Sequence, residues 1–174
     1  MNKYILFILI NTLVLTTSYA IEPLSNEQLR EVLANGIVIS SKSTKVEVLN
    51  ELGTPKEKKI STIRNPHNDK EDTVTSFEYP GITIKFYDHF EHKYPTRLVT
   101  ISVSDNKYKL PHGLHIGMTK EQLDDLFLKI IDKRTRDRDG RLMHFYQAYD
   151  SVHDQLIVTV ENGVISAVRW SNWP

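Results

Sequence analysis

The stretch Gln155-Leu-Ile-Val-Thr-Val-Glu-Asn-Gly-Val-Ile-Ser-Ala-Val-Arg-Trp170 decides the fold, because apolar and polar residues alternate on both sides of Asn162-Gly163. Strict alternation is typical of a half-buried strand. Asn-Gly is the strongest short hairpin signal, since both positions tolerate positive φ. The stretch therefore predicts an antiparallel hairpin with strands at 155–160 and 164–170.

The same alternation extends outward from this hairpin. Leu142–Tyr149 precedes it, and three more segments lie at 75–79, 82–87 and 97–103, the first two separated by the turn Pro80-Gly81. One row of each strand should face the core and the other should face water. In the last strand Val164, Val168 and Trp170 share one face, while Ile165, Ala167 and Arg169 share the other. Periodicity alone does not show which of these two rows is buried.

Three capping boxes mark helix starts. Ser25 with Gln28 predicts a helix at 26–34, and Thr44 with Glu47 predicts one that ends at Gly53. Thr119 with Gln122 predicts a third helix, whose apolar face is Leu123, Leu126, Phe127 and Ile130. The polar segments 61–74 and 88–96 are expected to be loops.

The predicted fold class is α+β, with two tandem units at 21–106 and 107–174. Each unit would consist of one or two helices packed on its own three- to four-stranded antiparallel sheet. Duplication is one explanation of the similar halves. Ordinary α+β patterning without duplication is the other.

Residues 1–20 have the features of a signal peptide. Lys3 is followed by the apolar run Tyr4–Leu15 and then by Ser18-Tyr19-Ala20, a small-x-small cleavage pattern. We therefore predict a periplasmic or secreted protein, with an uncleaved N-terminal anchor as the alternative. Cysteine is absent, so neither disulfides nor a lipid-modified cysteine is expected, and no stable membrane anchor should remain after cleavage.

Charge argues against some classes of partner. The chain has 22 basic and 22 acidic residues, whereas nucleic acids and anionic membranes require a concentrated basic patch. The basic cluster at 129–141 is interrupted by Asp132, Asp137 and Asp139. It is interpreted as a solvated loop or helix end, and nucleic acid is not expected as a partner.

Catalytic and metal-binding signatures are weak. His89 and His92, and likewise His112 and His115, are three residues apart, but no third ligand accompanies either pair. The chain has no cysteine nucleophile, no Gly-x-Ser-x-Gly and no phosphate-binding glycine loop. These observations favour a protein that is not an enzyme, with no cofactor and no catalytic or metal site.

Two segments carry a resemblance to a known module. Thr44–Pro55, which ends in Leu52-Gly53-x-Pro55, and Leu114–Leu123 resemble the helix-helix-meander module of the β-lactamase-inhibitory proteins. The small lipoproteins of the outer-membrane barrel-assembly machinery share it. The first group has two tandem modules and binds an enzyme across an exposed concave sheet face. The resemblance thus implies a protein-binding face, although the disulfides of that group and the lipidation cysteine of the other are missing here.

The hypothesis that follows is an inhibitor or immunity-type protein that blocks an exported enzyme or toxin through an open sheet face. An envelope-assembly or scaffold accessory protein and a small envelope hydrolase are the alternatives. Aromatic and basic side chains dominate binding hot spots. The predicted partner-binding residues are Lys85, Tyr87, His144, Tyr146, Arg169, Trp170 and Trp173.

Overall fold

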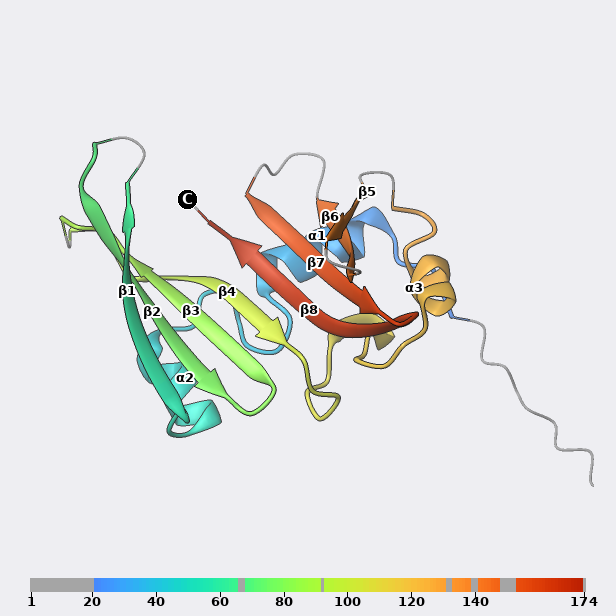
Figure 1. Ribbon diagram of the computed structural model, residues 1–174, viewed down its shortest axis with the longest axis horizontal. Helices are drawn as coiled ribbons and strands as arrows, with labels where there is room; N and C mark the ends of the chain where they lie inside the picture. The colour runs from blue at the N-terminus through green and yellow to red at the C-terminus, as the bar shows by residue number, and fades with distance from the viewer. Residues whose placement is uncertain are drawn as a thin grey trace, which may run out of the picture.

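The computed structural model describes residues 21–65, 68–91, 93–130, 133–138, 141–147 and 153–173. Its strands form one antiparallel eight-stranded sheet in the order β1-β2-β3-β4-β8-β7-β6-β5 (Figure 1). The strand bounds are β1 Glu57–Arg64, β2 Glu71–Tyr79, β3 Ile82–Asp88, β4 Arg97–Val103, β5 Lys133–Arg138, β6 Arg141–Gln147, β7 Asp154–Glu161 and β8 Val164–Asn172.

This sheet corrects the predicted fold class. Two tandem units, each with helices on a sheet of its own, were expected, but β4 pairs with β8 and makes all eight strands continuous. The joining contact runs from Thr100 opposite Ser171 to Val103 opposite Val168. Periodicity within a strand says nothing about such distant neighbours, which is why the prediction of separate sheets is wrong.

The helices begin where the capping boxes predict. They are α1 Asn26–Asn35, α2 Lys45–Leu52 and α3 Lys120–Leu126, and both hydrogen bonds of each box are formed. A short 3-10 helix, Pro111–Gly113, precedes α3. The third helix is shorter than predicted and ends at Leu126, although Phe127 and Ile130 are still buried.

Two strands form where loops were expected. β1 occupies part of the presumed 61–74 loop and begins before it, and β5 lies in the charged cluster that was interpreted as a loop or helix end. Every residue of β1 is exposed, so neither face carries an apolar row. β5 is likewise composed of charged residues and one Thr. Both are edge strands, and polar edges discourage pairing with other chains.

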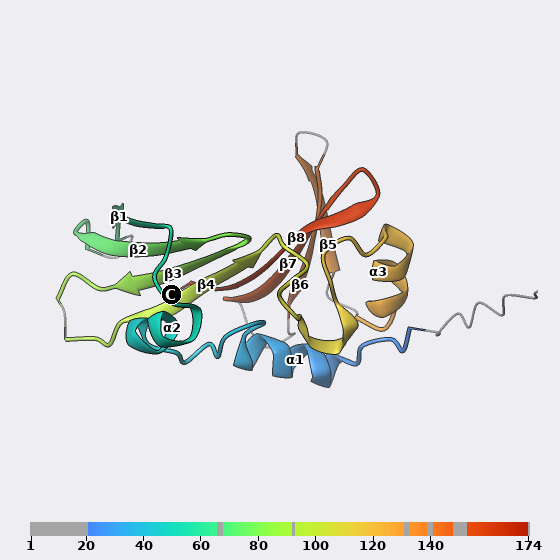
Figure 2. The same cartoon turned by 90° about the horizontal axis from the view of Figure 1, so that it is seen from below.

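The helices lie on one side of the sheet. In Figure 2, α1 and α2 are below the strands, and the two ends of the sheet rise on the opposite side. The main core fills the space between this helix layer and the sheet, and it includes Leu33, Ile101, Leu123 and Trp170. The other face of the sheet has no helix over it among the described residues, and this is the face seen in Figure 1.

Two register shifts determine which side chains face the helices. One lies between Lys85 and Phe86, so that Phe86 is opposite Leu98 while Val99 joins a smaller cluster outside the main core. The other lies between Thr159 and Val160. It places Ile165 in the core together with Val168 and Trp170, whereas simple alternation had assigned Ile165 to the opposite row. A bulge changes the phase of the pleat, which alternation alone cannot show.

Candidate functional site

The uncovered side of the sheet, here called the open face, is the candidate site. Residues directly opposite each other in an antiparallel sheet point to the same side, so the register identifies its members. It includes Glu57, Lys59, Ser61, Val74, Ser76, Glu78, Thr83, Lys85, Tyr87, Arg97, Thr100, Ser102, Arg134, Arg136, Met143, Phe145, Gln147, Gln155, Ile157, Thr159, Ala167, Arg169, Ser171 and Trp173.

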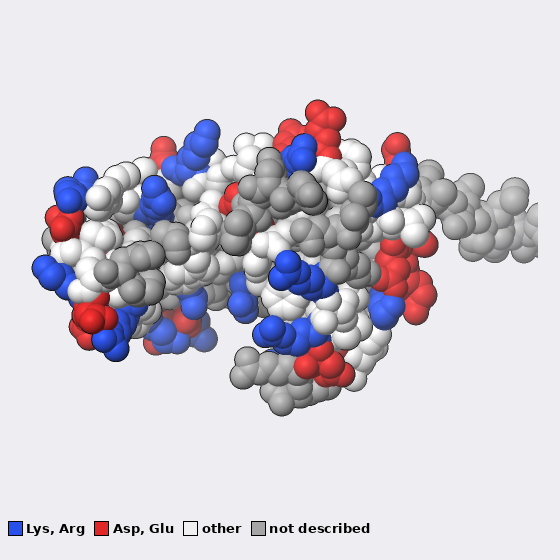
Figure 3. Space-filling model, turned by 90° about the horizontal axis from the view of Figure 1, so that it is seen from above, with Lys and Arg blue, Asp and Glu red and all other residues white. Residues whose placement is uncertain are grey.

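A shallow hollow lies at the centre of the open face, across the join between β4 and β8. Its volume is about 360 Å³. It is lined by Glu78, Thr83, Lys85, Thr100, Ser102, Arg169, Ser171 and Trp173. In Figure 3 the outline of the molecule is indented at its lower edge, between the two ends of the sheet, and Lys and Arg side chains border the indentation. We call the hollow lined by these eight residues the central hollow.

Tyr87 and Trp173 form an aromatic pair beside the central hollow. Their rings meet edge to face with centroids 6.4 Å apart. They pack with Val74 and Val99 in a small cluster separate from the main core. This cluster positions the Trp173 ring at the rim of the hollow, although Trp173 lies beyond the end of β8.

A buried carboxylate holds Tyr87 in place. Asp72 accepts a hydrogen bond from the Tyr87 hydroxyl, one from Asn65 Nδ2 at 2.8 Å and one from the Phe90 backbone N–H at 2.9 Å. Burial acts to raise the pKa of Asp72, but these three donors outweigh it and hold the pKa below its usual range. Burial, and then the bond to Asp72, raises the pKa of Tyr87 to about 12. The Tyr87 phenol therefore stays protonated and donates a hydrogen bond to the ionised Asp72 carboxylate.

The acidic residue of the central hollow, Glu78, forms an ion pair with Lys59. Lys59 Nζ lies 2.8 Å from Glu78 Oε1 and 3.2 Å from Glu57 Oε2. The hydrogen bond from Lys59 lowers the pKa of Glu78. Glu78 therefore stays ionised and is matched by a cation on its own side of the face.

The seven predicted partner-binding residues divide between the two sides of the sheet. Lys85, Arg169 and Trp173 line the central hollow, and Tyr87 lies next to it. That these four contact a partner stays a prediction.

The other three lie on the helix side, which corrects the expectation that they form a contact surface. Trp170 is 1% exposed and its Nε1 donates to the Leu33 carbonyl of α1 at 2.8 Å. Tyr146 is fully buried and stacks on Phe127, with centroids 3.9 Å apart. His144 is 2% exposed and lies near Thr135 Oγ1. None of the three is accessible to a partner in this fold.

Sequence reasoning missed a second basic segment of the open face. Arg134 and Arg136 are opposite Phe145 and Met143, and the Arg136 guanidinium carbon lies 5.9 Å from the Phe145 ring centroid. The sequence of this segment predicts a solvated loop or helix end, so it does not reveal the strand register that brings these side chains onto the face. The spacing Arg134-x-Arg136 was the one indication in the sequence that two basic side chains could lie on the same face of a strand.

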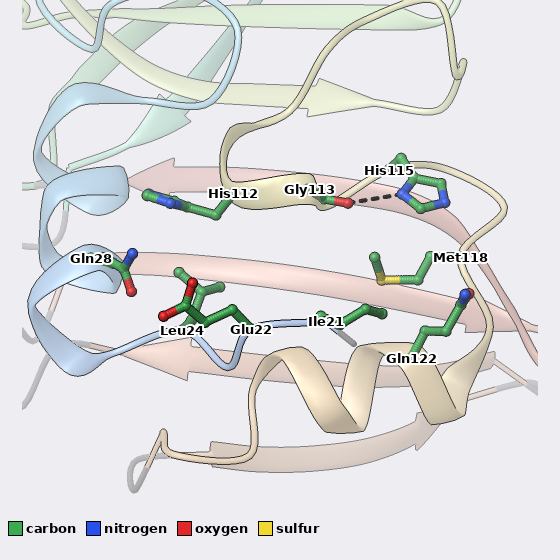
Figure 4. Close-up of a pocket in the computed structure, with 9 residues that line it drawn as sticks. All are labelled: Ile21, Glu22, Leu24, Gln28, His112, Gly113, His115, Met118 and Gln122. Atoms are coloured by element: carbon green, nitrogen blue, oxygen red, sulfur yellow. Dashed lines mark hydrogen bonds between the residues drawn. The ribbon is translucent and has the colours of Figure 1, made fainter. Parts of the chain in front are cut away.

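A second hollow, of about 390 Å³, lies on another part of the surface (Figure 4). It lies between the segment that precedes α1 and the Pro111–Gly113 turn, and His112, His115 and Glu22 are among its lining residues. His115 Nδ1 is 2.8 Å from the Gly113 carbonyl, and in Figure 4 the two imidazoles lie at different ends of the hollow. Because they do not converge, we place the candidate site on the open face.

The described part of the chain contains neither a candidate metal site nor a candidate membrane-spanning helix. There, no three His, Cys, Asp or Glu side chains are grouped as metal ligands. His92, of the pair with His89, lies outside that part. In the same ranges no helix is long and apolar enough to cross a membrane.

The arrangement defines an antiparallel-sheet protein with one face covered by helices and the other left open. No family model and no curated protein matches the chain. Two solved structures are similar to it. An extracellular SCP-domain protein from Bacillus anthracis is 12% identical, with a TM-score of 0.40 and coverage of 74% of this chain. This chain spans only 42% of that protein's length. The uncharacterised protein yfeY from Escherichia coli is 13% identical, with a TM-score of 0.44 and coverage of 78% of this chain and 94% of its own.

Proposed function

We propose that this chain is an exported inhibitor or immunity-type protein that binds and blocks another exported protein, an enzyme or a toxin, through its open face. Residues 1–20 have the pattern of a signal peptide, so its place of action is the periplasm or the medium. The observation that carries the proposal is a sheet face with no helix over it among the described residues. On this face Lys85, Arg169 and the half-buried Trp173 lie together, and the buried Tyr87 supports Trp173.

The size of the open face suits a protein partner. Eight strands about 4.8 Å apart and about 20 Å long present a face of about 700 Å². A standard protein interface buries about 800 Å² on each partner. The central hollow, by contrast, is lined by hydroxyls and charges with little apolar wall, whereas small-molecule sites are mostly apolar and enclose their ligands. Area and chemistry therefore both favour a macromolecule over an enclosed small molecule.

The composition of the open face also suits binding. Trp, Tyr and Arg carry most of the binding energy in protein interfaces, and all three occur around the central hollow. Tyr87 and Trp173 are held by packing and by the Asp72 hydrogen bond, so little side-chain entropy is lost when a partner arrives. The proposal assigns no catalytic step to any residue of the face.

The test combines capture with inhibition. The chain, tagged at its C-terminus, is used to capture proteins from the periplasm and medium of the source bacterium, in parallel with Trp173→Ala and Arg169→Glu. Lys42→Glu is the control, because Lys42 is exposed in the connection between α1 and α2, off the open face. We expect one protein retained by the wild type and the control and lost from both face variants. Purified chain should then inhibit that protein with one-to-one stoichiometry.

Two outcomes would contradict the proposal. Equal retention by the control and by both face variants would show that the open face is not the binding surface. A captured protein that keeps full activity when saturated with the chain, or steady association with a membrane complex, would exclude inhibition and support the envelope-assembly alternative.

A further inference from the structure

The open face carries five cations that form no ion pair among the described residues, although Lys85 is near enough to Glu78 to help lower its pKa. The ion pairs of the described residues involve Lys45, Lys59, Arg64, Lys93, Lys107, Lys120 and Arg141. None of them involves the open-face cations Lys85, Arg97, Arg134, Arg136 or Arg169. Since the whole chain has zero formal charge, its acidic residues lie mostly elsewhere. The open face is thus a basic surface on a neutral protein.

The register places hydroxyl groups between these cations. Thr83 on β3 is opposite Ser102 on β4, and Ser102 is opposite Arg169 on β8. In the next row Lys85 is opposite Thr100, which is opposite Ser171. Neighbouring strands are about 4.8 Å apart, and alternate residues along a strand are separated by about 6.7 Å. By that geometry the Lys85 and Arg169 Cβ atoms are about 12 Å apart, so the two long side chains can converge on one group.

These donors match a carboxylate. An Arg guanidinium binds a carboxylate through two parallel hydrogen bonds, and Ser and Thr hydroxyls can donate to its remaining lone pairs. All the polar groups that face the centre of the hollow are donors of this kind except Glu78, which Lys59 already engages. An acidic side chain would therefore find both charge and hydrogen-bond complementarity there.

We propose that the open face recognises an acidic loop of the partner protein, with one Asp or Glu carboxylate bound in the central hollow by Arg169, Lys85 and the Ser102 and Thr83 hydroxyls. This inference rests on the proposed function and specifies the chemistry of its partner. Arg97 on β4, and Arg134 and Arg136 on the edge strand β5, contact further acidic residues of the same loop. Trp173 at the rim packs against the backbone of the loop.

The experiment uses defined probes, so it does not depend on finding the partner. The ¹⁵N-labelled chain is titrated with an acetylated, amidated Gly-Glu-Glu-Gly peptide, with its Gly-Gln-Gln-Gly counterpart and with inorganic phosphate. We expect saturable shifts of the Thr83, Ser102 and Arg169 amides and of the Trp173 indole N–H with the acidic peptide only. The affinity should fall as salt is added, because exposed charges are screened.

Arg169→Gln is the decisive variant and Lys42→Gln is its control. Loss of a hydrogen-bonded charge contact costs about 1.5–3 kcal/mol, so Arg169→Gln should weaken the acidic peptide by at least about tenfold, while Lys42→Gln should leave its affinity unchanged. Arg169 is exposed, so the variant should fold, and its thermal midpoint is measured alongside.

Three results would overturn the inference. They are equal shifts with the glutamine peptide, tighter binding of phosphate than of the acidic peptide, and an unchanged affinity in Arg169→Gln. Any of these, together with partner capture that is lost in the face variants, would refute acidic recognition while the proposed function stands. Conversely, saturable binding of the acidic peptide with no partner lost on mutation of the face would refute the inhibitor role alone.

Discussion

Removing the Asp72 carboxylate should destabilise the protein and loosen the aromatic pair of the open face. Asp72 is 1% exposed and accepts hydrogen bonds from Tyr87, Asn65 and the Phe90 N–H. In Asp72→Ala all three donors lose their acceptor. The Phe90 N–H is only partly buried, so water can replace its bond, but the other two bonds lie in the interior.

The magnitude follows from those two buried donors. Each buried hydrogen bond to a charged group contributes about 1.5–3 kcal/mol, so the loss of two should lower the free energy of unfolding by about 3 kcal/mol. For a chain of this size each kcal/mol shifts the melting temperature by about 2–4 °C, which predicts a decrease of about 6–12 °C. The Tyr87 and Trp173 side chains should become more mobile on losing this support.

Thermal melts and urea titrations of Asp72→Ala, with Asp69→Asn as control, test this expectation. Asp69 pairs with Arg64 at 2.7 Å, but both side chains are more than 70% exposed. Asn tolerates the φ of +60° at this position, so loss of the pair should cost at most about 1 kcal/mol. Equal melting temperatures for the two variants would refute the assignment of Asp72 as a structural acceptor.

The pH dependence has a definite sign. The pKa of Asp72 is lower in the folded protein than in the unfolded chain, so its contribution to stability is fully present above the unfolded value of about 3.9. It disappears as the pH falls through the folded pKa. The stability difference between the wild type and Asp72→Asn should therefore shrink below about pH 4.

Further predictions concern the core, the turns and the phenol. Trp170→Phe should lose about 2–3 kcal/mol, because the buried Leu33 carbonyl loses its donor, whereas Trp173→Phe should change stability by less than about 0.5 kcal/mol in the same urea titration. Gly81→Ala should be strongly destabilising, since a Cβ there would lie 2.1 Å from Asp105 Cβ at φ +75°. Gly163→Ala, at φ +79° with no atom within 4 Å, should cost only about 1 kcal/mol by thermal melting; equal costs would refute the steric argument. Ultraviolet titration, read as the difference between the wild type and Tyr87→Phe, should show the Tyr87 phenolate only as the pH approaches about 12, and an ordinary phenol titration would contradict its burial against Asp72.

Local chemistry in the sequence predicted local structure well. Ser25, Thr44 and Thr119 mark helix starts because a cap depends only on residues three positions away. Asn162-Gly163 marks the turn between β7 and β8 because both residues adopt positive φ there. Strand pairings between segments that are distant in the sequence could not be predicted. Nothing near Val103 indicates that it pairs with Val168.

The candidate site was half predictable for the same reason. Alternation placed Lys85 and Tyr87 in the row opposite the core residues of their strand. For the last strand it left open whether the row of Arg169 or the row of Trp170 is buried. The face of Trp170 could not be assigned, because that depends on which side α1 packs. Arg134 was missed because β5 has no apolar row to reveal its register.

The same interactions that stabilise the fold also hold side chains of the open face in place, where the proposed partner would bind. Trp170 joins β8 to α1 from the covered side, while its neighbour Arg169 projects from the other side of the same strand. Asp72 likewise fixes Tyr87 from within the sheet, and Tyr87 supports Trp173. Part of the binding energy is lost when mobile side chains must be ordered. A rigid, basic face would reduce that cost and accelerate encounter with the proposed acidic partner surface. Asp72→Ala, which loosens the support of Tyr87, should therefore change the association rate constant for the proposed partner less than the dissociation rate constant. Arg169→Gln should change both rate constants.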